Sequence, residues 1–183
     1  MRLFIAIDLP DEIKQKLALL IKGFTKYDLD AKWVQDKNLH LSLKFLGEVT
    51  EEKIAEIQKV IKEAADWSSC LEATLNNFGF FPNEKHPRVF FVATNREEEL
   101  KHIAMKLEDA LEKLGFAKEN RFTSHITLAR LKSTKNIEAL KNELKKVSVQ
   151  EKMPVKEIVL FKSTLKPTGP VYERIFSAAM KKG

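Results

Sequence analysis

Cysteine is almost absent from this sequence, which contains only Cys70 among its 183 residues. A single cysteine forms no intramolecular disulfide and supplies no multi-thiolate zinc site, so we expect a protein of the reducing cytoplasm. No His-x-His or His-Glu-x-x-His pattern occurs, and no carboxylate adjoins the histidines of the two motifs described below. We therefore expect neither a metal nor any other cofactor.

Long apolar runs and glycine-rich phosphate loops are also missing. No apolar run reaches membrane-spanning length, so we expect no membrane partner. Residues 1–10 are apolar but lead directly into an acidic, amphipathic segment, which indicates a first strand rather than a signal peptide. The absence of a Walker-type loop gives no support to a ligase driven by a nucleotide triphosphate.

Basic residues, in contrast, are in excess, and the net charge is +6. This charge makes polyanions candidate partners. The alternative is a solvated basic surface, because lysines and arginines alternate with glutamates along the expected helices.

Apolar periodicity and turn residues predict a chain in which strands and helices alternate. The expected strands are 2–8, 32–34, 40–46, 71–81, 88–94, 124–131, 155–165 and 171–178, and the expected helices are 11–24, 50–64, 97–114 and 137–147.

Two tetrapeptides within this pattern match each other: His40-Leu41-Ser42-Leu43 and His125-Ile126-Thr127-Leu128. Each combines a histidine and a hydroxyl residue with apolar residues, inside an expected strand. Side chains alternate between the faces of a strand, so the histidine and the hydroxyl of each copy should share one face. We expect that face to line a cleft and the apolar residues to enter the core.

The surroundings of the tetrapeptides also repeat. Arg2 precedes His40 by 38 positions, and Arg88 precedes His125 by 37. Residues 2–81 and 88–178 both run strand, helix, motif strand, helix, strand. We therefore expect an α+β fold in which residues 1–183 form a single bilobal domain with pseudo-two-fold duplication. Two mainly antiparallel sheets should line a central cleft, with the helices outside.

The paired motifs and their flanks resemble the 2H phosphoesterases, and within them the RNA 2′,3′-cyclic phosphodiesterases, historically called 2′–5′ RNA ligases. The resemblance covers essentially the whole chain. One departure is Ser42, where the family usually has threonine, and it keeps the hydroxyl. The supporting segments are Arg2-Leu3-Phe4-Ile5-Ala6, residues 40–47, 79–82, 87–89 and 125–130, Ser163-Thr164-Leu165 and residues 169–172.

The resemblance implies metal-independent hydrolysis of RNA 2′,3′-cyclic phosphate ends to 2′-phosphomonoesters. It assigns His40 as proton donor and His125 as proton acceptor. Two histidines across a phosphorus atom suit these roles, because imidazole is available in both protonation states near neutral pH. Ser42 and Thr127 are expected to donate hydrogen bonds to the phosphate oxygens. Attack by an RNA 5′-hydroxyl instead of water would give reversible 2′–5′ ligation.

Strand parity ranks the remaining candidates for substrate binding. Lys44, four residues after His40, has the parity of the cleft face. Arg130 suits phosphate but has the opposite parity, unless its strand ends or bulges first. Parity places Phe45 in the core, and Tyr172 either stacks on a base or packs in the core. Lys85 and Arg88 flank a proline loop and are candidates for binding the RNA backbone.

Two alternatives stay open at the level of sequence. The motif residues are expected to bind only the phosphate, so the substrate can instead be a small cyclic nucleotide or ADP-ribose cyclic phosphate. The protein can also be a non-catalytic module that binds RNA ends. On the main interpretation its partner is RNA with a 2′,3′-cyclic phosphate end, tRNA fragments being one source, and no obligatory protein partner is expected.

Overall fold

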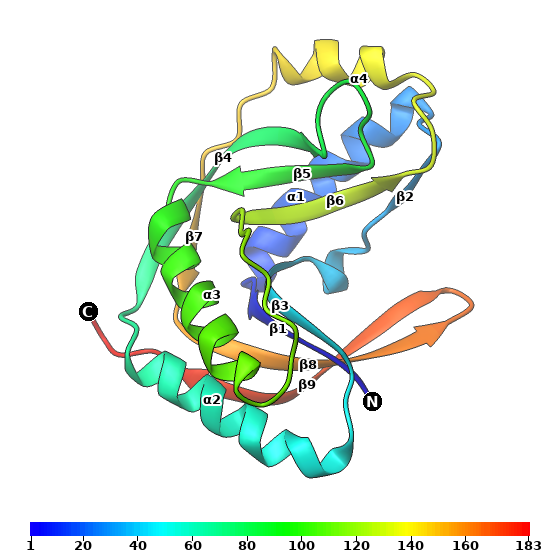
Figure 1. The fold of residues 1–183 in the computed structure, drawn as a ribbon. Coiled ribbons are helices and arrows are strands. Elements are labelled where there is room, and N and C mark those ends of the chain that lie inside the picture. Colours follow the sequence, from blue (N-terminus) through cyan, green and yellow to red (C-terminus); the bar gives the residue numbers. More distant parts are fainter.

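The chain is built around one curled antiparallel sheet of nine strands (Figure 1). The computed structural model describes all residues, 1–183. The strand order is β7-β4-β5-β6-β3-β1-β8-β9, and β2 pairs with β6. The strands are β1 (Arg2–Asp8), β2 (Ala31–Trp33), β3 (His40–Glu48), β4 (Leu71–Phe81), β5 (Val89–Thr94), β6 (His125–Leu131), β7 (Glu151–Val155), β8 (Glu157–Lys166) and β9 (Gly169–Ala179).

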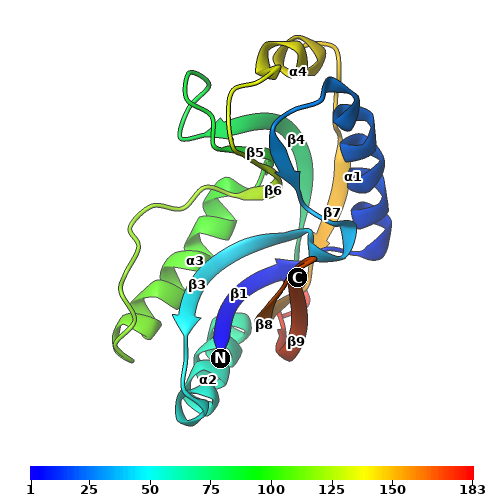
Figure 2. The same ribbon diagram turned by 90° about the vertical axis from the view of Figure 1, so that its right-hand side faces the viewer.

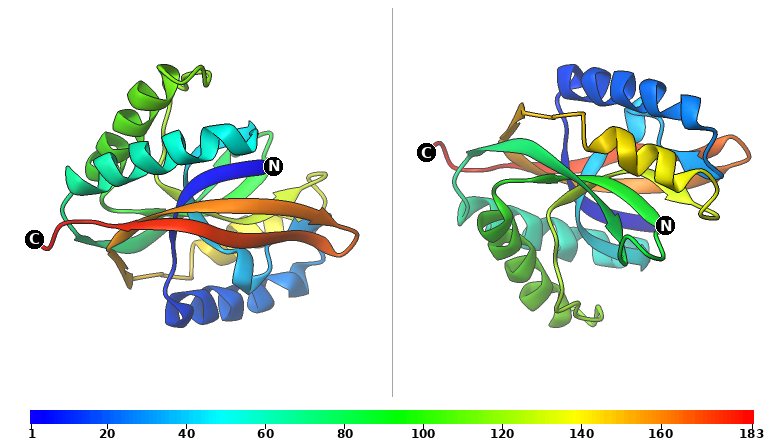
Figure 3. Two further views of the ribbon diagram at one scale, coloured as in Figure 1. Left: turned by 90° about the horizontal axis from the view of Figure 1, so that it is seen from below. Right: turned by 90° about the horizontal axis from the view of Figure 1, so that it is seen from above.

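The helices are α1 (Asp11–Phe24), α2 (Ile54–Asp66), α3 (Glu97–Glu112) and α4 (Ile137–Leu144). They lie in two groups, with α1 on the opposite side of the molecule from α2 and α3 (Figures 2 and 3), and helices of both groups contribute to one apolar core. The α1 helix turns an apolar stripe inward, and its Phe24 ring packs edge-on against Phe78 of β4 and Phe90 of β5. The α2 and α3 helices contact each other; α2 also packs on β8 and β9, and α3 packs on β3. No helix has the length and apolar character needed to cross a membrane.

The expected α+β fold is confirmed, and its two halves meet at the motif strands. β3 and β6 are antiparallel and pair through Leu41 and Ile126. This pairing joins the two expected sheets into one continuous sheet. From the centre outward, β1, β8 and β9 follow β3, while β5, β4 and β7 follow β6.

The outer strands are exchanged between the halves of the chain. β4 belongs to the first half of the sequence but pairs with β5, and β8 belongs to the second half but pairs with β1. Each lobe is thus completed by a strand from the other half.

Both motif strands contain a bulge at the same position. In β3 the partners of Ala6 and Ile5 are Ser42 and Lys44, so Leu43 has no partner in β1. In β6, Leu128 is skipped in the same way between Thr127 and Ala129. Because a bulge inserts one extra residue, it reverses the facing of every later side chain.

The terminal strands differ from expectation. The segment 151–155 forms β7, which the sequence did not predict because it contains Pro154 and charged residues. Proline is tolerated here because β7 lies at the edge of the sheet. Beyond it, β8 and β9 form a long hairpin that projects past the rest of the molecule (Figure 3).

Candidate active site

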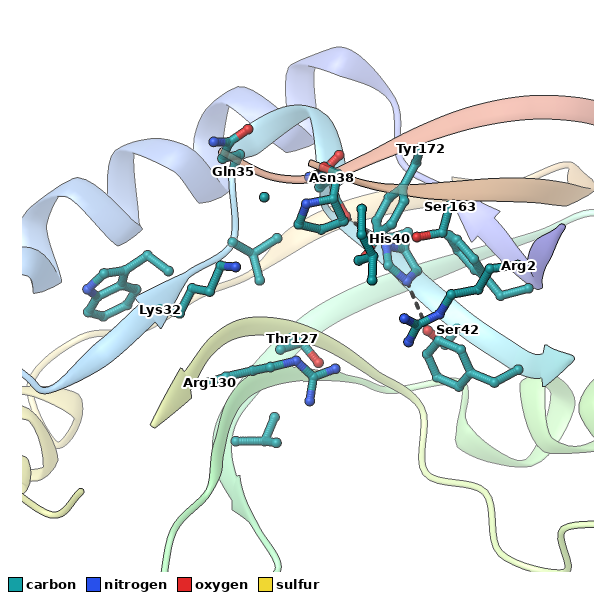
Figure 4. Close-up of a pocket in the computed structure, with 18 of the residues that line it drawn as sticks. Arg2, Lys32, Gln35, Asn38, His40, Ser42, Thr127, Arg130, Ser163 and Tyr172 are labelled. Carbon is teal, nitrogen blue, oxygen red and sulfur yellow. Dashed lines mark hydrogen bonds between the residues drawn. The ribbon is translucent and has the colours of Figure 1, made fainter. Parts of the chain in front are cut away.

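A cleft of about 600 Å³ lies where the motif strands meet (Figure 4). His40, Ser42, His125 and Thr127 all line it. The intervening Leu41, Leu43, Ile126 and Leu128 are buried in the core, at 0–5% exposure. The alternation expected for both tetrapeptides is therefore present, and it brings the two copies to one site.

The two histidines are held in the same way. The Nδ1 atom of His40 lies 2.7 Å from the carbonyl oxygen of Asn38, and that of His125 lies 2.7 Å from the carbonyl oxygen of Thr123. A carbonyl oxygen only accepts hydrogen bonds, so Nδ1 carries the proton in each ring. The neutral imidazole then has its lone pair on Nε2, which is the atom left for proton exchange in both rings.

Burial lowers the pKa of both imidazoles. The pKa of His40 falls from 6.5 to about 4, chiefly because burial disfavours the charged ring, and the charge of His125 lowers it further. The backbone hydrogen bond to Asn38 and the charge of Asp8 oppose this fall. Burial also lowers the pKa of His125, and Arg130 adds to the effect. In the free protein both rings are consequently neutral near pH 7.

The hydroxyl groups lie beside the histidines. Ser42 Oγ is 3.0 Å from His40 Nε2, and it donates to that nitrogen while the ring is neutral. Thr127 occupies the corresponding place on β6, two residues after His125. Both hydroxyls face the cleft (Figure 4) and are available to an anion bound between the strands.

Lys44 is not a cleft residue, and the expectation from strand parity is wrong for it. The bulge at Leu43 turns Lys44 to the core side, where it is 4% exposed. Its Nζ lies 2.8 Å from Glu108 Oε2 of α3 and 2.6 Å from the carbonyl oxygen of Ala117. Lys44 therefore links α3 and the loop that follows α3 to the motif strand β3.

The same reversal brings Phe45 and Arg130 to the cleft. The expected core position of Phe45 is wrong: the residue is 53% exposed and lines the cleft. The bulge at Leu128 settles the orientation of Arg130, which also lines it. Phe45 and Arg130 occupy corresponding positions, since each follows its motif histidine by five residues.

Aromatic rings support both histidines. On one side His40 contacts Phe4 at 4.9 Å and Tyr172 at 5.3 Å between ring centroids. Tyr172 also packs against Phe4, a member of a small buried apolar cluster, so core packing is the better of its two expected roles, and burial raises its pKa. On the other side the His125 ring meets Phe81 edge-on at 4.8 Å. These contacts restrict both imidazole orientations.

Other cleft residues were missed as binding candidates in the sequence. Lys32 of β2 lines the cleft and has no motif to reveal it, because its position depends on the pairing of β2 with β6. Arg2 marked only the start of a repeat, although it too reaches the cleft (Figure 4). Lys85 and Arg88 lie outside the cleft lining.

The lining contains cations and hydrogen-bond donors but no carboxylate. No group of three or more histidine, cysteine, aspartate or glutamate side chains converges anywhere in the structure. Two neutral imidazoles, two hydroxyls and two guanidinium groups around one cleft form a set with the chemistry to bind an anion and to exchange protons with it.

Comparisons with known proteins agree with this geometry. The sequence model described as LigT like phosphoesterase matches residues 7–91 and 92–172. A Thermotoga maritima protein named RNA 2′,3′-cyclic phosphodiesterase is 33% identical, over 100% of this chain and 97% of its own length. A Methanocaldococcus jannaschii protein of the same name is 36% identical, over 96% and 98%. The crystal structure of the Thermus thermophilus protein TT0787 superposes with a TM-score of 0.83 and 30% identity, covering 100% of this chain and 99% of that one.

Proposed function

Because this chain belongs to the family of LigT like phosphoesterases, we propose that it is a cyclic phosphodiesterase that opens the 2′,3′-cyclic phosphate at the end of an RNA strand. The relatives named RNA 2′,3′-cyclic phosphodiesterase support this substrate. The observation that carries the mechanism is the pair of histidines held through Nδ1, each with Nε2 left for proton exchange.

The reaction needs one proton removed and one supplied. His125 Nε2 takes a proton from water as the water oxygen attacks phosphorus, and the bond from phosphorus to the ribose 3′ oxygen breaks. His40, protonated in the substrate complex, gives its proton to that leaving oxygen. The products are a 2′-phosphomonoester and a free 3′-hydroxyl. The negative phosphate assists, because a nearby anion raises the pKa of His40 from its low value in the free protein.

Ligation is the same chemistry with a different nucleophile. An RNA 5′-hydroxyl that replaces water at phosphorus forms a 2′–5′ bond while the 3′ oxygen leaves. The cyclic phosphate supplies the driving force, and no nucleotide triphosphate takes part. Water is far more abundant, so hydrolysis dominates.

The direct test is an RNA oligonucleotide with a 2′,3′-cyclic phosphate end, incubated with the purified protein in EDTA. We expect a single product that carries its phosphate on the 2′ oxygen. Phosphorus NMR or resistance of the product to a 3′-specific phosphatase distinguishes the two monoesters. A 3′-phosphate product, or complete loss of turnover on addition of EDTA, would contradict the mechanism.

Activity should depend on pH in a way fixed by the two lowered pKa values. The profile of kcat/KM reports the free enzyme, and we expect its maximum below pH 6.5. The value of kcat/KM falls at low pH because the base, His125, becomes protonated. It falls at higher pH because the acid, His40, loses its proton. Both limbs lie below the usual histidine pKa of 6.5. A kcat/KM maximum above pH 6.5, with circular dichroism showing intact fold throughout, would refute this.

Removing a hydroxyl should reduce the stabilisation of the transition state more than it reduces the affinity for the substrate. We expect Ser42→Ala to lower kcat by about 10²-fold with a smaller change in KM, the size seen when one donor to a developing charge is lost. Thr127→Val should behave alike. Ser42→Thr is the matched control, because it keeps the hydroxyl, and it should retain most activity. An equal loss in Ser42→Thr and Ser42→Ala would show that packing, rather than the hydroxyl, matters.

A further inference from the structure

Three cations line the cleft, and no neighbouring carboxylate neutralises them. Arg2, Lys32 and Arg130 make no ion pair and no side-chain hydrogen bond, and no acidic residue lines the cleft with them. Unpaired cations gathered around one cleft indicate an anionic ligand.

These cations lie at different distances from the histidines. Arg130 lies near the reacting centre, since its charge acts on His125 and on Tyr172. Lys32 stands directly opposite Arg130 on the neighbouring strand, β2. Adjacent strands are about 4.8 Å apart, so Lys32 lies one strand further than Arg130 from β6, the strand that carries His125. In Figure 4 its side chain extends from β2 toward the cleft, beside Arg130.

The backbone directs Lys32 outward into this position. In β2 the flanking Ala31 and Trp33 are partly buried, while Lys32 is exposed. Arg130 is likewise exposed on β6. The two cations therefore share the cleft side of their strand pair. The opposite wall, formed by β1, β3 and the β8–β9 hairpin, presents the third cation, Arg2, beside the aromatic rings of Phe4 and Phe45.

A cyclic mononucleotide carries a single phosphate, and on the proposed function the histidines, the hydroxyls and Arg130 bind it. A cation one strand further out has no partner in such a ligand. In an RNA strand, the next group of opposite charge is the internucleotide phosphate on the 5′ side of the terminal nucleotide.

We propose that Lys32 binds this internucleotide phosphate, so that the cleft selects an RNA strand of two or more nucleotides over a cyclic mononucleotide. The inference rests on the proposed function and adds to it a second phosphate site and a direction: the RNA leaves the cleft across β2. Lys32 acts on the identity of the substrate and takes no part in the proton transfers.

The test compares two substrates that share a reacting end. One is a nucleoside 2′,3′-cyclic monophosphate, and the other is a dinucleotide that ends in the same cyclic phosphate. We expect Lys32→Ala to lower kcat/KM for the dinucleotide about tenfold, as befits a lost hydrogen bond to a charged group. The value for the mononucleotide should stay unchanged. Lys32→Arg should keep the preference for the dinucleotide.

Salt dependence supplies an independent measurement. Each phosphate contact made to single-stranded nucleic acid contributes about 0.7 to the slope of log affinity against log salt. We expect Lys32→Ala to reduce the slope of log kcat/KM against log salt concentration by that amount, for the dinucleotide only. Lys62→Ala is the matched control, because Lys62 is an exposed lysine of α2, outside the cleft. It should change neither the slope nor the preference.

The outcomes separate this inference from the function on which it rests. Equal losses on both substrates would overturn it, because Lys32 would then act at the reacting phosphate or on the fold. No loss on either substrate would overturn it too. If the unaltered protein turns over neither substrate, the proposed function fails and the second phosphate site fails with it.

Discussion

Replacing either histidine by alanine should lower kcat by about 10² to 10⁴-fold, the usual contribution of a positioned acid or base. His40 and His125 are each held through Nδ1 to a backbone carbonyl and face one cleft. One transition state needs both proton transfers, so their effects should not add. We expect the double variant to be little slower than the slower single variant. Single-turnover rates on an RNA oligonucleotide with a cyclic phosphate end provide the measurement.

A matched control is available on the same chain. His102 is an exposed histidine of α3 and does not line the cleft, so His102→Ala should leave kcat unchanged. Wild-type rates in His40→Ala or His125→Ala would eliminate acid–base catalysis by this pair. A double variant slower by the product of the two single losses would show that the histidines serve separate steps.

Breaking the buried ion pair between β3 and α3 should have the largest effect on stability. Lys44 and Glu108 are joined at 2.8 Å, with side chains 2% and 3% exposed. Lys44→Ala leaves the Glu108 carboxylate buried without its cation, which costs about 3–5 kcal/mol in comparable pairs. We expect the free energy of unfolding to fall by that amount, and the urea midpoint reports it.

The paired variant Lys44→Met with Glu108→Leu provides the control, because it removes both charges and keeps apolar volume. Replacing a buried pair by well-packed apolar residues is often neutral or stabilising, so this variant should recover most of the loss. If it is as unstable as Lys44→Ala, volume and packing dominate over the uncompensated charge. If Lys44→Ala costs less than about 1 kcal/mol, the value expected of an exposed pair, the burial of the pair has no energetic consequence.

The sequence predicted the centre of the cleft because a simple periodicity holds there. From His40 to Leu43 and from His125 to Leu128 the strands are regular, so alternation assigns every side chain to the correct face. The α+β architecture was equally accessible, since apolar repeats of two and of three to four residues separate strands from helices.

The same periodicity failed beyond the bulges. Lys44, Phe45 and Arg130 all follow a residue that the neighbouring strand skips. Neither bulge contains the glycine that often marks such a position, and only pairing with β1 and β5 defines them. Lys32 was hidden for a related reason, because its place at the cleft depends on pairing with β6, a strand from the other half of the chain.

The exchange of β4 and β8 between the lobes has a consequence for folding. Each half of the chain resembles one member of a domain-swapped pair, with the segment 82–88 as the covalent link. Neither half contains its own complete lobe, since β1 needs β8 and β5 needs β4. A nascent first half would leave the edge of β1 open until the second half has been synthesised. Assembly of the cleft is therefore a late, long-range event, and topologies of this kind fold slowly.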